Sequence, residues 1–373
     1  MLTFTASAPL TLGVELELQL IDRQTRDLSP SSPELLSALA SHPRVEQFKP
    51  EITKSMIELN SSVHQQVDSL GDELLQLRDV LVEHCDKLGI DICGGGTHPF
   101  QHWADRQIFP SERFEQLADD YGYLARRFTV FGQHIHIGCP NGDAAVYLSQ
   151  QLLRYIPHFV ALAASSPYHL GIDTGLNCAR LAAVWTFPLA GHMPSLRNWS
   201  EFNQYFQELQ QLGVAGSIKD LYWDVRPKPE FGTVEIRIID TPLTVQLATD
   251  LAAYAQTLAK HLLDQAWQPM PETLQRVHRH NLFQACRHGY AGTITNPFTA
   301  QPVTLADDLL NCLHQLLPVA RSLGTEAALN RLAARTERRG NDATLARQAV
   351  AQGLDLPGLV ARHCQQFRAD PPR

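Results

Sequence analysis

TLGVELELQLI, at residues 11–21, alternates apolar and polar side chains without interruption, and this pattern decides the fold class. The apolar positions are Val14, Leu16, Leu18 and Leu20, and the other positions are Gly13, Glu15, Glu17 and Gln19. A period of two over this length is typical of a half-buried β-strand. Glu15 and Glu17 then lie about 6.5 Å apart along one face. If that face is covered, a bound Mg²⁺ or Mn²⁺ would relieve the repulsion and desolvation of both carboxylates; a side that faces solvent is the alternative.

The composition is that of an ordinary globular protein. The chain has 373 residues, of which 44% are apolar and 19% charged, and its net charge is −8 with histidine neutral. It has no long basic tract, so we expect neither nucleic acid nor a membrane surface as a partner. It shows neither a signal-peptide pattern nor an apolar run of about eighteen residues, so we expect no transmembrane helix. Seven scattered cysteines without a C-x-x-C pair favour free thiols in a reducing cytoplasm.

Further strand and helix patterns predict how the chain is organised. Residues 218–226 and 231–240 have strand character, and the short Pro-Lys-Pro-Glu connection between them favours an antiparallel hairpin. Apolar spacing predicts helices at about 64–88, 111–128, 143–165 and 200–212, and a helical pattern after 244. These elements predict an α+β fold with helices stacked on an antiparallel sheet. We expect one catalytic domain over 1–373, with a sheet-forming part at 1–243 and a mostly helical part at 244–373.

FGQHIHIGC, at residues 131–139, is another strand pattern, and it places His134 and His136 on one face. Neutral imidazole binds zinc, copper, iron or nickel, and it also contributes single ligands to carboxylate-rich Mg²⁺ or Mn²⁺ sites. Buried histidines that only form hydrogen bonds in the core are the alternative.

FGTVEIRIID, at residues 231–240, places Glu235 and Arg237 on one face of a third strand. This pair is either a cross-strand ion pair or a metal ligand beside an arginine that stabilises transferring phosphoryl charge. Glu51 and Glu58 lie among apolar residues, which makes them candidate ligands or salt-bridge partners. Carboxylates, imidazoles and an arginine on adjacent strand faces together indicate a surface that binds several metal ions and handles phosphate.

Five segments carry a resemblance to a known family. They are GVELE (13–17), PEITKSMIELN (50–60), GGGTHPF (94–100), QHIHIG (133–138) and TVEIRIID (233–240). Taken in this order, the set resembles the YbdK-type carboxylate–amine ligases, grouped with the type 2 glutamate–cysteine ligases in the glutamine synthetase-like superfamily. The match covers about residues 13 to 240.

The resemblance implies a glutamine synthetase-like fold, a curved antiparallel sheet with helices packed on one face and divalent metals on the concave face. It also implies a reaction. The γ-phosphoryl group of ATP is transferred to a substrate carboxylate, and an amine attacks the resulting acyl phosphate to give an amide. Glutamate–cysteine ligase activity is expected, while the physiological acid and amine stay open.

The resemblance also assigns roles to individual residues. The expected ligands of Mg²⁺ or Mn²⁺ are Glu15, Glu17, Glu51, Glu58, His134 and Glu235. Arg237 matches the arginine that contacts phosphate, and His136 is expected to touch phosphate or substrate. Arg180 and Arg197 lie in stretches similar to the family's substrate-side segments, where either could bind substrate or nucleotide; a structural or surface role is the alternative for both.

Two other functions are compatible with the motifs. A zinc-dependent hydrolase of the amidohydrolase type also has His-x-His on a strand, but its (β/α)₈ barrel needs eight strand–helix units that this chain does not show. A non-catalytic nucleotide-binding member of the same fold is the other alternative. The chain has no G-x-x-x-x-G-K-[ST] motif, so a P-loop is not expected. Small-molecule substrates are the expected partners, and a homodimer is left open.

Overall fold

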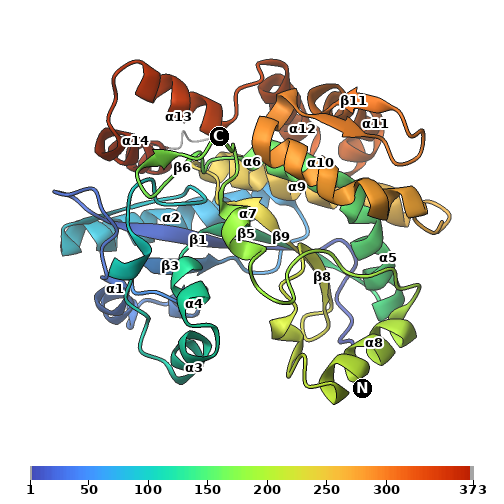
Figure 1. Ribbon diagram of the computed structural model, residues 1–373, viewed down its shortest axis with the longest axis horizontal. Helices are drawn as coiled ribbons and strands as arrows, with labels where there is room; N and C mark the ends of the chain where they lie inside the picture. The colour runs from blue at the N-terminus through green and yellow to red at the C-terminus, as the bar shows by residue number, and fades with distance from the viewer. Residues whose placement is uncertain (1, 370–373) are drawn as a thin grey trace.

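The computed structural model describes residues 2–369, and its centre is a seven-stranded sheet (Figure 1). Six strands follow the order β2-β3-β1-β5-β9-β8, and β4 pairs with β1 beyond this path. Every pairing in this sheet is antiparallel. The strands are β1 (Leu12–Asp22), β2 (Phe48–Pro50), β3 (Met56–Asn60), β4 (Ile90–Cys93), β5 (Gly132–Gly138), β8 (Val225–Lys228) and β9 (Thr233–Asp240). The predicted α+β fold with an antiparallel sheet is confirmed, and a (β/α)₈ barrel is excluded for these residues.

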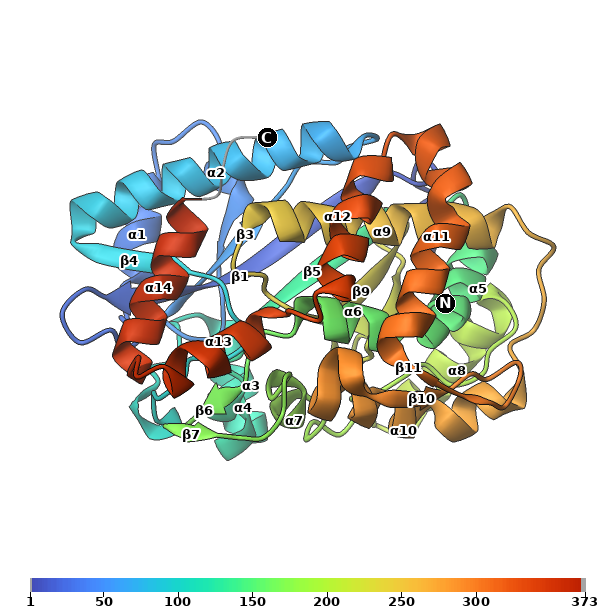
Figure 2. The same ribbon diagram turned by 90° about the horizontal axis from the view of Figure 1, so that it is seen from above.

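The main helices cover the apolar face of the sheet, as seen from above in Figure 2. Leu16, Ile135 and Ile236 are fully or almost fully buried on this face. It is covered by α2 (Val67–Leu88), α5 (Gly142–Leu152), α6 (Ile156–Ala163) and α9 (Val245–Leu263). The short helix α1 (Ser32–Leu39) packs against α2 and β2. The helices α3 (Glu112–Tyr121), α4 (Tyr123–Arg127) and α8 (Trp199–Gln211) lie toward the two ends of the sheet (Figure 1). The polar face of the sheet lies between these two sets of helices, and its side chains His134 and Glu235 are buried.

The C-terminal part is helical, as predicted, apart from one small hairpin. Its other helices are α10 (Glu272–His288), α11 (Leu305–Leu323), α12 (Glu326–Glu337), α13 (Asp342–Ala351) and α14 (Leu356–Arg368), and its hairpin consists of β10 (Thr293–Thr295) and β11 (Pro302–Thr304). One cluster of buried apolar side chains extends from Leu12 to Phe367 and joins both parts of the chain. A shared core of this kind is expected for one folding unit, so the single domain stays our prediction.

Three predicted elements differ from the structure. The helix predicted at 111–128 is divided into α3 and α4 at Gly122, whose φ is 52°. Residues 218–226 are not one strand, because Ile218–Asp220 forms the 3₁₀ helix η4 and β8 begins only at Val225. The side chains of Ser217 and Asp220 cap η4 reciprocally, which stabilises a helical turn where strand character was predicted. The helix predicted at 143–165 is interrupted between α5 and α6, where Pro157 lies in the first turn of α6. The predicted antiparallel hairpin of β8 and β9 is confirmed.

The remaining elements are short. They are β6 (Tyr168–His169), β7 (Ile172–Asp173), α7 (Arg180–Val184) and the 3₁₀ helices η1 (Val45–Gln47), η2 (Trp103–Asp105), η3 (Leu153–Tyr155) and η5 (Gly289–Ala291). None of the helices within residues 2–369 combines the length and apolar character needed to cross a membrane.

Candidate active site

Strand register gathers the polar motifs on the polar face of the sheet. In β1, Glu15 lies opposite His134 of β5, and Glu17 lies opposite Glu58 of β3. Farther along, His136 of β5 lies opposite Glu235 of β9. Side chains that are directly opposite in an antiparallel pair share a face, so three motifs distant in sequence meet there.

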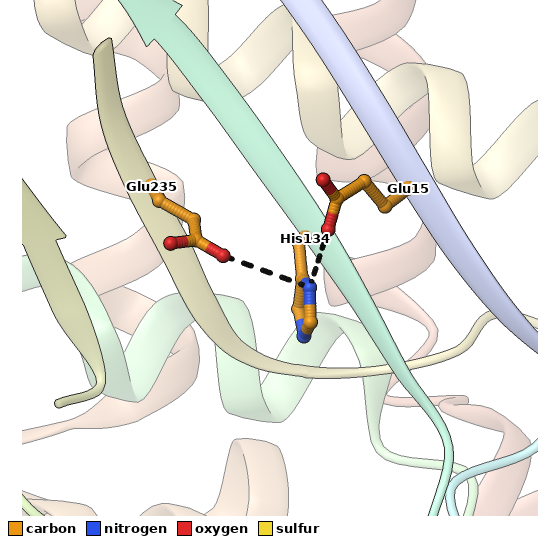
Figure 3. Close-up of side chains that lie close together, drawn as sticks. All are labelled: Glu15, His134 and Glu235. Carbon is orange, nitrogen blue, oxygen red and sulfur yellow. Dashed lines mark hydrogen bonds and ion pairs between the residues drawn. The ribbon is translucent and has the colours of Figure 1, made fainter. Parts of the chain in front are cut away.

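A first group consists of Glu15, His134 and Glu235, which come from three adjacent strands (Figure 3). The Nδ1 atom of His134 lies 2.8 Å from Glu15 Oε2 and 3.8 Å from Glu235 Oε1. Each of the three side chains offers a ligand atom within 4.8 Å of the other two. The ladder between β5 and β9 shifts register here, because Arg237 and Ile238 of β9 lie opposite the single residue His134 of β5. Such a bulge re-aims side chains of the bulged strand, which is β9 at Arg237.

A second group shares His134 and adds Glu17 and Glu58, again with ligand atoms within 4.8 Å of one another. The Nε2 atom of His134 lies 3.7 Å from Glu17 Oε1. The other oxygen of Glu17 accepts a hydrogen bond from the backbone N–H of Gly132 at 2.5 Å. Asn60 donates to Glu58 at 2.8 Å. Both groups therefore combine carboxylates with one imidazole, a donor set suited to Mg²⁺ or Mn²⁺.

Two carboxyl groups at this face have raised pKa values. Burial and the neighbouring Glu17 carboxylate raise the pKa of Glu51 to about 7. Burial, followed by Glu15 and Glu51, raises the pKa of Glu58 well above its ordinary value. Both carboxyl groups therefore resist ionisation without a cation, because each would add a charge to a crowded acidic surface.

The ionisable side chains of the first group instead have lowered pKa values. Burial opposes ionisation of Glu15, but His136 and His134 lower the pKa of its carboxyl below the ordinary value. Burial likewise opposes ionisation of Glu235, but Arg226 and Arg237 lower its pKa well below the ordinary value. Burial and then Arg237 lower the pKa of His134. A neutral His134 beside ionised carboxylates is the form that binds a cation.

Two arginines contact Glu235 from opposite sides. The Nε atom of Arg226 donates to Glu235 Oε2 at 2.8 Å, and Arg237 contacts the other oxygen. Burial works against the charge of Arg237, but Glu235 and Glu15 raise its pKa, so this guanidinium stays protonated. Arg226 was missing from the predicted site. Arg226 lies directly opposite Glu235 in the hairpin. The only sign of its role in the sequence was its positive charge at the end of a segment with strand character.

His136 points its unpaired nitrogen toward the first group. Its Nδ1 atom lies 3.0 Å from Thr233 Oγ1, and its Nε2 atom lies 3.2 Å from Glu15 Oε1 without hydrogen-bond geometry. Glu15, His136 and Thr233 also line a pocket of about 330 Å³, together with Gly13 and Phe231. This pocket opens directly beside the carboxylates, and its volume lies in the range of small-molecule sites.

The comparison with known proteins agrees with this arrangement. The sequence profile of glutamate-cysteine ligase family 2 (GCS2) matches residues 11–358. The chain belongs to this family. It is 52% identical over 368 residues to a Bordetella avium (strain 197N) protein named "Putative glutamate--cysteine ligase 2", with 98% of this chain and 91% of that protein covered. A Chromobacterium violaceum protein of the same name is 46% identical over 367 residues, with 98% and 97% covered.

Solved structures share the fold of this family member. One is a glutamate–cysteine ligase from Francisella tularensis in complex with AMP, with a TM-score of 0.73 and 14% identity over 98% of this chain and 90% of that one. Another is a bifunctional glutathione synthetase from Pasteurella multocida, with a TM-score of 0.69 and 15% identity over 96% of this chain and 51% of that one. At such identities the likeness shows the fold. The family resemblance of the five sequence segments is confirmed.

The two arginines that the resemblance placed on the substrate side have different positions. Arg180 begins α7 and is buried, and its guanidinium donates to the backbone carbonyl of Arg237 at 3.3 Å. It also packs so tightly on Gly132 that a Cβ there would lie 2.0 Å from its Nη2 atom. Arg197 is not brought to this face. Its side chain is 84% exposed and pairs with Glu201 four residues along, as helical spacing allows.

Proposed function

We propose that this protein is an ATP-dependent carboxylate–amine ligase that forms an amide through an acyl phosphate, with glutamate and cysteine as its first candidate substrates. Membership of glutamate-cysteine ligase family 2 supports this function. The observation that carries the proposal is the pair of ligand groups joined at His134 beside Arg226 and Arg237. Phosphoryl transfer depends on positioning and charge neutralisation more than on a protein nucleophile, and this site offers those two properties.

The donor set fits divalent cations. Glu15, Glu17, Glu58, His134 and Glu235 would hold Mg²⁺ or Mn²⁺. Glu51 is in neither group, although its carboxyl interacts electrostatically with Glu17 and Glu15. The raised pKa values of Glu51 and Glu58 support this, because a cation favours the ionised form of both. Bound Mg²⁺ would neutralise charge on the ATP phosphates.

The arginines of the site have separate tasks in this proposal. Arg226 is buried and donates to Glu235 and to two backbone carbonyls, so it fixes the carboxylate in place. Arg237 keeps part of its guanidinium accessible, with its side chain 20% exposed, and would contact the transferring phosphoryl group. His136 Nε2 lies between the carboxylates and the pocket lined by Phe231, where it would contact phosphate or substrate.

The pocket of about 330 Å³ is our candidate for the nucleotide. Glu15 and the exposed Phe231 both line it, so a nucleotide with its phosphates at the carboxylates would have an aromatic side chain available for its base. The Francisella tularensis ligase, which shares this fold, was solved in complex with AMP. Phe231→Ala should therefore raise the KM for ATP with little effect on kcat.

The deciding experiment is ADP release by purified protein with ATP, Mg²⁺, glutamate and a panel of amines led by cysteine. Amine-dependent ADP release, together with a new amide in the mass spectrum, would establish the ligase. ATP binding without turnover on any pair would instead favour a non-catalytic nucleotide-binding protein. Tightly bound zinc and activity without ATP would overturn the proposal altogether.

The setting of the reaction is a further expectation. All seven cysteines are free, and six of them are buried, which supports a reducing cytoplasm as the location. Cell fractionation with a compartment marker tests this placement.

A further inference from the structure

The carboxyl group of Asp240, at the end of β9, is not part of either ligand group and is almost fully buried. Its Oδ2 atom accepts hydrogen bonds from the backbone N–H of Ser165 at 3.1 Å and from the Ser166 hydroxyl at 2.6 Å. Its Oδ1 atom accepts from the Cys178 thiol at 3.1 Å. The protein itself thus occupies both oxygens, so Asp240 is not a candidate for contact with substrate.

Gly96 makes room for this carboxyl group. A Cβ atom at Gly96 would lie 2.4 Å from Cγ of Asp240 and 2.5 Å from its Oδ1 atom, so a larger residue would push the carboxyl away. The backbone N–H of Gly96 also donates to the Ser165 hydroxyl at 3.1 Å, which fixes the glycine loop against the same segment. The close approach gives the third glycine of GGGTHPF a structural reason.

Ser166 connects Asp240 to α7, the helix that carries Arg180. While its hydroxyl donates to Asp240, its Oγ atom accepts from the backbone N–H groups of Ala179 at 3.0 Å and of Arg180 at 3.3 Å. The first N–H groups of a helix have no partner within the helix, and Ala179, at the N-cap, has no polar side chain to cap them. Ser166 therefore holds the start of α7, and Asp240 orients the hydroxyl that does so.

The side chain of Arg180 connects α7 to two strands of the candidate site. Its Nη1 atom donates to the carbonyl of Arg237 at 3.3 Å, where the bulge disrupts the ladder of β9. The backbone N–H of Arg237 donates to the carbonyl of Asp224 at 2.8 Å, so both backbone polar groups of Arg237 are held. Arg180 also packs on Gly132, whose N–H donates to Glu17 at 2.5 Å. A displaced Arg180 would therefore loosen the backbone at Arg237 and beside Glu17.

We propose that Asp240 is a positioning residue for Arg237. It acts through the Ser166 hydroxyl and the Arg180 side chain, and it touches no substrate itself. The inference rests on the proposed ligase function and deepens it, because Arg237 is the group that would contact the transferring phosphoryl group. A small displacement of such a group lowers the rate of the chemical step more than it weakens substrate binding, so the effect falls on kcat rather than on the KM for ATP.

Ser166→Ala tests the connection to α7, and Ser165→Ala is the matched control. Both hydroxyls are buried in the same segment, but that of Ser165 contacts Gly96 and Thr241 rather than α7. In ADP release, Ser166→Ala should lower kcat about five- to tenfold and leave the KM for ATP within about twofold. The control should change neither value by more than about twofold. An equal fall of kcat in both variants, or in neither, would overturn the proposal.

Asp240→Asn and Asp240→Leu have similar volumes and separate the acceptor oxygen from packing. Burial raises the pKa of Asp240 although Arg180 and Ser166 work against it, and in either protonation state its Oδ2 atom can accept from Ser166. Asparagine keeps an oxygen for Ser166 and can turn its amide nitrogen toward Cys178, so kcat should stay within about threefold. Leucine keeps no acceptor, and kcat should fall at least about tenfold. Equal kcat values in the two folded variants would refute the assignment.

A double variant tests whether the effect passes through Arg180. In protein that already carries Arg180→Ala, the further change Ser166→Ala should lower kcat by no more than about twofold, because the side chain on which Ser166 acts is gone. Two losses that multiply would show that Ser166 acts independently of Arg180, and the proposal would be wrong.

Urea unfolding separates this inference from the ligase proposal, because it requires no turnover. The loss of stability in the double variant should be smaller than the sum of the two single losses, because the Ser166 cap also stabilises the contacts of Arg180. Such coupling without ADP release from any substrate pair would leave the anchoring of Arg180 standing and sink the ligase function. ADP release with additive losses of stability would do the reverse.

Discussion

Replacing Glu235 by glutamine is the sharpest perturbation of the candidate site, because it removes one charge and almost no volume. The carboxylate of Glu235 is buried, contacts both Arg226 and Arg237, and has an oxygen 3.8 Å from His134 Nδ1. The amide oxygen can still accept one hydrogen bond. It cannot neutralise two guanidinium groups or serve as a charged metal ligand.

The structure sets the expected magnitudes. Hydrogen bonds to charged groups contribute about 1.5–3 kcal/mol each, and one of the two is retained, so the free energy of unfolding should fall by roughly 2 kcal/mol. Loss of a charged group that acts on the transferring phosphoryl group should lower kcat about 100-fold or more, in line with the removal of single stabilising groups in other enzymes. A folded but inactive protein is the predicted result.

Urea unfolding and ADP release measure the two effects separately. Glu201→Gln is the control, because it also removes a carboxylate from an arginine pair, but at the exposed Arg197. The control should leave stability and turnover unchanged. Near-normal turnover in Glu235→Gln would mean that this carboxylate is structural, and the reasoning about the site would be wrong.

Three further predictions concern pH, the phosphate contact and packing. Glu51 has a pKa of about 7 in the folded chain and an ordinary value of 4.5, so the folded state holds more protons between these values. The free energy of unfolding of the metal-free protein should therefore fall, on the order of 3 kcal/mol, as pH rises from 4.5 to 7. Mg²⁺ should raise the Tm more at pH 8 than at pH 5.5. An equal rise at both pH values would contradict the assignment of Glu51 and Glu58. Arg237→Lys should lower kcat by at least tenfold and change ATP binding less, because a point charge cannot replace the planar guanidinium. An unchanged kcat in steady-state kinetics would mean that Arg237 has only a structural role. Gly132→Ala should destabilise the protein by about 1–3 kcal/mol in urea unfolding, because a Cβ would clash with Arg180, and wild-type stability would mean that Arg180 is not held there.

The sequence predicted much of the sheet because alternation is a local property. Glu15 and Glu17 had to share a face once residues 11–21 formed a strand, and the same holds for His134 with His136. Their meeting in space depends on register, which no local pattern specifies. The register shift opposite His134 is one example, since it arises from the pairing of β5 with β9.

The positions of Arg226 and Arg197 also depend on the tertiary structure, which the sequence pattern does not specify. Arg226 and Asp224 lie in a segment predicted as one long strand, and a capped 3₁₀ turn takes up its first part. Their relation to the site appears only when β8 pairs with β9. Arg197 was judged by its neighbourhood in the sequence, although Glu201 four residues later already offered it a local partner.

His134 belongs to both ligand groups, and its tautomer decides which group it could serve as a metal ligand. A neutral imidazole carries one proton, so an Nδ1 that donates to Glu15 leaves the lone pair on Nε2, which lies on the side of Glu17. With that tautomer, His134 could offer a lone pair only to a cation in the group of Glu17 and Glu58, and a cation in the group of Glu15 and Glu235 would need another imidazole. His136 provides one, because its Nδ1 is held by Thr233 while its Nε2 lies 3.2 Å from Glu15 and 4.0 Å from Glu235. If His134 has this tautomer in the proposed site, it would ligate a cation only in the group of Glu17 and Glu58, and His136 would supply the imidazole for the group of Glu15 and Glu235.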